Sequence, residues 1–268
     1  MRKKNRLSTE FIFQVFSLML IVIVVHAAFV GFIRPSADAI LAQQALRVEA
    51  DATYRAERSL LVLVRDYEQE ACFILMFWAL AIMAFKAAAT IRDRALLDEN
   101  LIPLEEGVRI LPEDTRDVSR RIEALPARQR SALLPRALLA GLQRYTATSN
   151  IQDVAEATRA YCTAESERLE SELSMMRYIA WAIPSIGFIG TVRGIGDALG
   201  QAHQAIEGNI FGVTRSLGVA FNSTLIALLI SIVLMFVLHQ LQLLQERYVL
   251  EAEAYCEENL TRHLHSGA

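Results

Sequence analysis

Two threonines in apolar stretches of the sequence have side chains that could take part in ion transfer. Thr191 lies in an apolar stretch from 178 to about 205, and Thr224 lies in another from about 211 to 240. A hydroxyl donates one hydrogen bond and accepts up to two, so it can bind a carboxylate, a water or a backbone carbonyl. The two hydroxyls can act together only if their helices bring them to the same depth.

Helix geometry predicts that they reach the same depth. Thr191 follows Arg177 by 14 residues, about 21 Å along a helix. Thr224 precedes His239, at the other helix's inner end, by 15 residues, which is about 22 Å. In antiparallel spans the hydroxyls would lie level with each other. There they could bond each other or a carbonyl, or face a polar group from another chain.

Small residues recur at three- and four-residue steps around both threonines, which places them on one helix face. Small residues let helix backbones approach closely in membranes, and Gly190–Gly194 and Gly196–Gly200 are both GxxxG pairs. For each residue alone, an ordinary helix contact is the simpler interpretation. The residues predicted to pack the helices and line an ion path are Pro184, Gly187, Gly190, Gly194, Ala220, Ser223 and Ala227.

Arg193 and Asp197 are the charged residues of the third apolar stretch. Their four-residue spacing predicts an ion pair on one helix face. Arg193 lies about 24 Å along the span, near the outer interface. In one interpretation the pair and snorkelling place Arg193 among lipid headgroups. In the other, Arg193 faces a pore entrance and contacts a partner.

Three further polar residues lie in the apolar stretches. His26 and His239 lie toward span ends, where a histidine acts as a polar anchor, so neither is assigned a proton role. Asn222 is predicted to form a hydrogen bond with a neighbouring helix.

Four apolar segments are long enough to position these residues in a membrane. They run over 11–33, 71–91, 178–205 and 211–240, and about 20 apolar residues span the hydrocarbon core as a helix. The first is too long for a signal peptide, although the PSADA sequence after it keeps cleavage as an alternative. The expected fold class is an all-α polytopic membrane protein with four transmembrane helices, the last two extended into a cytoplasmic helical region.

Lysines and arginines near the span ends predict that both termini are cytoplasmic. Arg34 and Arg215 are the contrary signals on the outer side. The residues that favour the cytoplasmic assignment are Arg2, Lys3, Lys4, Arg6, Lys86, Arg92, Arg94, Arg177 and Arg247.

The remaining segments are predicted to be helical. Prolines at 103, 112, 126 and 135 divide the cytoplasmic part into short helices, and the chain from 151 onward should run as one helix into the third span. The predicted parts are 1–33 (cytoplasmic N-terminus and first span), 34–70 (outer loop), 71–91 (second span), 92–176 (cytoplasmic domain), 177–240 (third and fourth spans) and 241–268 (C-terminal helix).

Composition excludes several other classes of protein. The 268 residues are 53% hydrophobic with a net charge of −3, and their mean hydropathy is +0.29, which indicates a membrane protein rather than a nucleic-acid binder. Three distant cysteines predict neither a disulfide framework nor a metal site. The glycines do not form GxGxxG or a Walker A loop. No cofactor is expected.

Two stretches resemble the MotA/TolQ/ExbB proton channel family. IPSIGFIGTVRGIGDAL, from 183 to 199, is similar to the family's P-x-x-G-x-x-G-T-V-x-G-I helix start, and SLGVAFNSTLIALLISI, from 216 to 232, is similar to its A-L-x-x-T-x-x-G-L helix. The resemblance in sequence covers residues from about 177 to 240. The rest of the chain resembles the family only in the arrangement of its segments. The family threonines near the partner aspartate match Thr191 and Thr224.

The resemblance implies a motor subunit in a bacterial inner membrane. Family members form homopentamers around two copies of a single-span partner with an essential transmembrane aspartate, and ion flow through the complex drives mechanical work. The residues agree, because no carboxylate lies well inside the predicted spans and one must come from another chain. The hydroxyls of Thr191 and Thr224 would solvate it.

The sequence also departs from the family. The ExbB and TolQ branches have a glutamate at the position of Val219, and its absence here resembles the flagellar branch. The GTV sequence at 190–192, however, is more similar to ExbB and TolQ. The branch, and the choice between protons and sodium, stay open. The leading hypothesis is an ion-driven motor subunit, and the competing one is a non-conducting scaffold with the same fold. No set of residues typical of a catalytic site supports an enzymatic function.

Overall fold

The computed structural model describes residues 6–50, 59–99, 101–102, 110–206, 208 and 210–265. It is 88% helical, and in these residues the only extended pairing is an isolated bridge between Ile110 and Leu264. Arg2, Lys3, Lys4 and Pro103, on which part of the sequence prediction rested, lie outside the described residues. So do 51–58 of the predicted outer loop.

Two compact units make up the chain. Unit 1 comprises residues 1–83 and 175–238, and unit 2 comprises 84–174 and 239–268. Helices α4 and α10 contribute residues to both units. The predicted parts 1–33 and 71–91 therefore fall mostly in unit 1 with the third and fourth spans.

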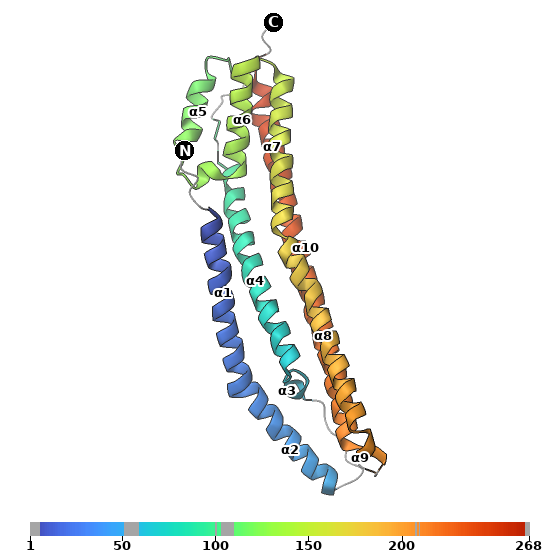
Figure 1. The fold of residues 1–268 in the computed structure, drawn as a ribbon. Helices are drawn as coiled ribbons and strands as arrows, with labels where there is room; N and C mark the ends of the chain where they lie inside the picture. Colours follow the sequence, from blue (N-terminus) through green and yellow to red (C-terminus); the bar gives the residue numbers. More distant parts are fainter. Residues whose placement is uncertain are drawn as a thin grey trace. The chain divides into compact units, whose positions relative to one another are not determined.

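Unit 1 begins with one long helical run. It consists of α1 (Arg6–Ala28), a short π-helix (Phe29–Ile33) and α2 (Arg34–Ala50). The predicted first span of 11–33 is helical, and the helix continues past it (Figure 1). Phe29 is buried, and its ring centroid lies 6.0 Å from that of Phe73 on α4.

The other helices of unit 1 complete the apolar bundle. They are α3 (Leu60–Leu63), α4 (Tyr67–Arg94), α8 (Ser174–Gly200), α9 (Ala202–Ile206) and α10 (Phe211–Asn259). Helix α4 begins at Tyr67, four residues before the predicted span, so Glu68 and Glu70 form its first turn. Helices α8 and α10 lie side by side in unit 1 (Figure 1).

Four of the helical runs are long and apolar enough to cross a membrane: Phe11–Arg47, Tyr67–Leu97, Ile151–Gly200 and Phe211–His263. The predicted fold class is confirmed, and the chain is a multi-pass membrane protein.

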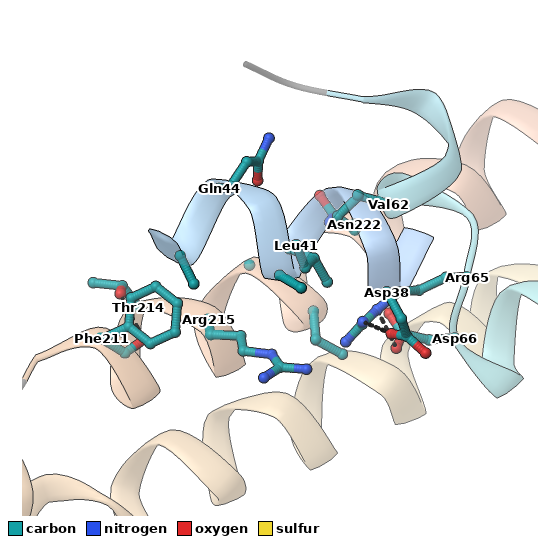
Figure 2. A pocket seen from close by; sticks show the side chains of 14 residues that line it. Asp38, Leu41, Gln44, Val62, Arg65, Asp66, Phe211, Thr214, Arg215 and Asn222 are labelled. Atoms are coloured by element: carbon teal, nitrogen blue, oxygen red, sulfur yellow. Dashed lines mark hydrogen bonds and ion pairs between the residues drawn. The ribbon is translucent and has the colours of Figure 1, made fainter. Parts of the chain in front are cut away.

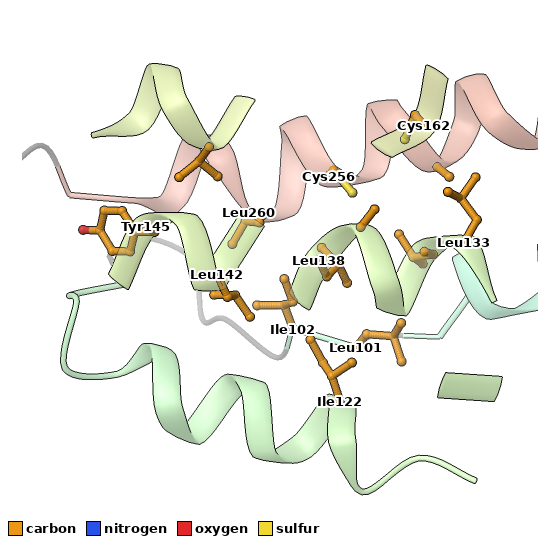
Figure 3. Close-up of a cluster of buried hydrophobic side chains, with 14 of the residues drawn as sticks. Leu101, Ile102, Ile122, Leu133, Leu138, Leu142, Tyr145, Cys162, Cys256 and Leu260 are labelled. Atoms are coloured by element: carbon orange, nitrogen blue, oxygen red, sulfur yellow. The ribbon is translucent and has the colours of Figure 1, made fainter. Parts of the chain in front are cut away.

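Unit 2 is a small helical domain with its own core. It contains the short 3₁₀ turns Ala95–Leu97, Gln129–Ser131 and Thr261–His263, helices α5 (Thr115–Glu123), α6 (Leu133–Thr148) and α7 (Ile151–Glu172), and the last turns of α10. Leucines of α6 pack against α7 and α10 (Figure 3). The Tyr145 hydroxyl, fully buried, bonds the carbonyls of Ile110 (3.2 Å) and His265 (2.8 Å).

Local sequence signals explain the helix ends in unit 2. Pro135 lies in the first turn of α6, where the missing N–H costs nothing. Ser149 takes a left-handed conformation (φ 51°) after α6, and Asn150 caps α7 by accepting from the Gln152 N–H at 2.9 Å. The predicted unbroken helix from 151 is interrupted at Leu173, between α7 and α8.

Two groups in unit 2 bear on the sequence predictions. Lys86, which interrupts the second apolar stretch, is buried and pairs with Glu172 of α7 at 2.8 Å, as a buried charge requires. Cys162 and Cys256 share one hydrophobic cluster, and Cys72 lies in unit 1; all three are free and buried.

Candidate functional site

The structure brings Thr191 and Thr224 together where α8 crosses α10. Their hydroxyl oxygens are in hydrogen-bond contact. The Thr191 hydroxyl also lies 3.1 Å from the carbonyl oxygen of Ala220 and 3.3 Å from that of Gly187. The Thr224 hydroxyl lies 3.2 Å from the same Gly187 carbonyl oxygen. The two side chains therefore meet at one depth, as the sequence predicted.

Counting protons shows what this pair can still bind. The two hydroxyls have two protons between them, and three acceptors surround them: two carbonyl oxygens and one hydroxyl oxygen. Every proton can thus be used within the chain. Hydroxyl lone pairs remain, so the pair as it stands can accept a hydrogen bond. It can donate one to a new group only by giving up one of these internal hydrogen bonds.

Three of the predicted glycines are required by the close approach of α8 to α10. A Cβ added at Gly187 would lie 2.4 Å from the Cβ of Ala227, and one at Gly190 would lie 2.5 Å from the Cβ of Ser223. A Cβ at Gly194 would lie 2.8 Å from Ala220 atoms. These contacts are shorter than carbon atoms tolerate, so only glycine fits. By contrast, Gly196 and Gly200 face open space, and this GxxxG pair packs against nothing described in the chain.

Pro184 creates an unpaired carbonyl that the fourth span satisfies. Proline has no N–H, so the helical bond from position 184 to the carbonyl of Ala180 is missing. The hydroxyl of Ser231 on α10 donates to that oxygen at 3.0 Å. In a membrane, where no water replaces a lost bond, such repair by a serine is what allows a proline inside a helix.

Arg193 has a partner that the sequence analysis missed. Its guanidinium donates two hydrogen bonds to the Glu68 carboxylate, at 2.6 and 2.8 Å. The predicted ion pair with Asp197 is also present, at the longer distance of 4.0 Å. The signal was an acidic first turn of α4, which the predicted boundary at 71 assigned to the outer loop. The bidentate pair joins α4 to α8.

The first turn of α4 contacts a different part of unit 1 with each of three consecutive residues. Besides Glu68, the fully buried Gln69 donates to the Leu63 carbonyl (3.1 Å) and to Ser223 Oγ on α10 (3.5 Å). Glu70 binds Arg34 and accepts from His26 Nδ1 at 2.7 Å. His26 is therefore more than a lone polar anchor, since it is tied to a buried carboxylate.

These contacts define one end of unit 1, which we name the distal end. It carries the segment 59–66, the end of α8 and the start of α10, whose residues line a shared cavity. Within the described residues, no cluster of three His, Cys, Asp or Glu could hold a metal. The only carboxylate of α8 is Asp197, and α10 has none before Glu246.

Sequence comparison adds one match. Residues 129–254 match the MotA/TolQ/ExbB proton channel family, a range wider than the 177–240 on which the resemblance rested. No curated protein and no solved structure matches the chain significantly.

Proposed function

Because residues 129–254 match the MotA/TolQ/ExbB proton channel family, we propose that the chain belongs to this family and is an ion-conducting subunit of a membrane motor. The Thr191–Thr224 pair at the crossing of α8 and α10 carries this proposal, because it places two hydroxyls beside two carbonyl oxygens within an apolar bundle. The role is that of a channel, not of an enzyme.

The ion would pass by way of a carboxylate supplied by another chain. The acidic residues of α4 and α8 are Glu68 and Glu70 in the first turn of α4, Asp93 in its last turn and Asp197 near the end of α8. Among the described residues, none of them forms a hydrogen bond with Thr191 or Thr224. Intramembrane carboxylates are the usual proton relays, so the missing group must come in trans. We place it on a single-span partner, present in two copies inside a homopentamer of this chain.

The proton count suggests how the pair would respond to that carboxyl. A protonated carboxyl donates its single proton to a threonine oxygen while both threonine protons stay on carbonyl oxygens. An ionised carboxylate can only accept, so one hydroxyl must give up its hydrogen bond to Ala220, to Gly187 or to the other threonine. The threonines would thus be coupled to the protonation state of the partner.

The proposed setting is a bacterial inner membrane, with both termini in the cytoplasm and the distal end outside. The cations flanking the described spans favour this orientation: Lys86, Arg92 and Arg94 follow one end, while Arg34 and Arg215 are the contrary ones. The driven process and the choice between protons and sodium depend on the partner.

A non-conducting scaffold is the second candidate function. It is favoured by the same count, since the hydroxyl protons can all be satisfied inside the chain, and by Arg193, whose charge is held by Glu68 rather than left for an ion path. Family membership alone does not separate the two functions.

Ion flux separates them. The complex, reconstituted with its partner in vesicles, is expected to conduct protons or sodium, and Thr224→Val to lower the flux by about 10²-fold or more, since the hydroxyl is removed without changing volume. Thr224→Ser should keep most of it. Thr163→Val, at an exposed threonine that bonds only within α7, is the matched control. No flux above protein-free vesicles would favour the scaffold, whereas full flux in Thr224→Val would exclude it and would contradict the role given to the threonine pair.

A further inference from the structure

A cavity of about 490 Å³ opens at the distal end of unit 1 (Figure 2). Its walls come from α2, from the segment 62–66 and from the first three turns of α10. A volume of this size is in the range of small-molecule sites. No pattern in the sequence indicates this cavity, and Asn222, which was predicted to form a hydrogen bond with a neighbouring helix, lines it.

The charged residues of the cavity balance each other. Arg65 donates to Asp38 at 2.8 Å and lies 3.6 Å from an Asp66 oxygen, so these three carry one net negative charge (Figure 2). Arg215 adds one positive charge from α10, and among the described residues no carboxylate forms an ion pair with it. The lining is therefore neutral in sum, with an available cation on α10 and two carboxylates near α2.

Asp66 has unused hydrogen-bonding capacity. Its second carboxylate oxygen is buried and has no donor among the described residues. Burial raises the pKa of this carboxyl, and the charges of Arg65, Arg193 and Arg215 oppose the shift. A buried carboxylate of this kind is stabilised by a ligand that brings hydrogen-bond donors and a positive charge.

The rest of the lining is apolar and lies where the hydrocarbon region would begin. Leu41, Val62 and Val219 contribute apolar side chains. Arg215 is the last charged residue of α10 before an uncharged stretch that runs to Gln245. The polar and apolar walls therefore meet at the level where lipid headgroups meet acyl chains.

We propose that this cavity binds a zwitterionic phospholipid whose headgroup ends in a primary ammonium. The phosphate lies on Arg215, the ammonium lies between Asp38 and Asp66, and an acyl chain follows Leu41 and Val219. The headgroup of phosphatidylglycerol can donate hydrogen bonds from its hydroxyls but brings no positive charge to the two carboxylates. A choline headgroup has the right charge but cannot donate hydrogen bonds. Binding pockets between transmembrane helices are a known mode of headgroup recognition.

The test compares three lipids on the delipidated full-length protein in detergent. Phosphatidylethanolamine, phosphatidylcholine and phosphatidylglycerol are added separately, and the unfolding midpoint and the bound lipid are measured by thermal scan and mass spectrometry. The ethanolamine lipid is expected to raise the midpoint most and to remain bound. Equal stabilisation by all three would overturn the proposal, as would a protein segment occupying the cavity in a structure of the complex.

Variants separate lipid binding from a general loss of folding. Arg215→Gln should weaken the ethanolamine lipid about tenfold, the effect of losing one charged hydrogen bond. Asp38→Asn, at a side chain 67% exposed, should leave the fold intact and shift the preference toward phosphatidylglycerol, because the lining becomes positive. Arg116→Gln in α5 is the control with no expected effect. An unchanged lipid preference in both cavity variants would refute the proposal, which does not depend on ion conduction.

Discussion

At the scale of single residues, α8 and α10 pack so closely at their crossing that no further side-chain atom fits between them. Gly187, Gly190 and Gly194 face Ala227, Ser223 and Ala220 at distances that no Cβ tolerates. The Ser231 hydroxyl donates a hydrogen bond to the Ala180 carbonyl, which Pro184 leaves without its helical donor. The threonine pair depends on this close contact, because each hydroxyl reaches a carbonyl of the opposite helix.

Adding one methyl group at the crossing should separate the two helices. Gly187→Ala is expected to lower the free energy of unfolding by about 1–3 kcal/mol, the usual cost of overpacking. Gly196→Ala on the same helix is the matched control, because its Cβ would meet open space; its stability should be unchanged or slightly higher. Chemical or thermal unfolding in detergent measures both. Equal effects at both glycines would contradict the packing account.

The bond from Ser231 to the Ala180 carbonyl can be tested in the same way. Ser231→Ala should destabilise the protein by about 1–2 kcal/mol, because the buried oxygen loses its donor and proline prevents the helix from replacing it. In Pro184→Ala the helix can restore its own bond, so the serine substitution made in that background should cost little. A cost that stays the same in both backgrounds would show that the bond is not the cause.

At the scale of elements, the start of α4 joins the other long helices of unit 1. Glu68 binds α8, Gln69 binds α10, and Glu70 binds the α1–α2 run. The turn before it carries Asp66, whose charge is buried at a cost. These three consecutive polar residues therefore bind the start of α4 to its neighbouring helices, although their sequence alone indicates only a solvated helix end.

The burial of Asp66 predicts how stability depends on pH. Because the folded pKa of Asp66 is raised above 3.8, folding favours the protonated form. Its contribution to stability is fully present below about pH 3.8 and is lost as the pH rises through the folded value. Asp66→Asn should therefore unfold at a higher temperature than the native protein at pH 7 without lipid. The difference should shrink as the pH is lowered toward 4, and a constant difference would contradict the prediction.

At the scale of the whole molecule, much of the fold follows from the sequence. Four apolar runs predicted the four long helices, and the spacing from Arg177 and His239 predicted that Thr191 and Thr224 lie at similar depth. The start of the helix that carries the second span was not predicted. The span was predicted from Ala71, where the apolar run begins, and only the structure shows that Glu68 and Glu70 belong to the same helix and pair with Arg193 and Arg34. The break at Leu173 and the distal cavity depend on tertiary packing, which no local pattern encodes.

The central claim is that this chain conducts ions only with a carboxylate from another chain. The most direct measurement is the native mass of the complex purified from its own membranes, with every co-purifying chain identified. The account predicts five copies of this chain around two copies of a single-span protein that carries an acidic residue in its span. A stable monomer, or a pentamer with no such partner in any preparation, would contradict it.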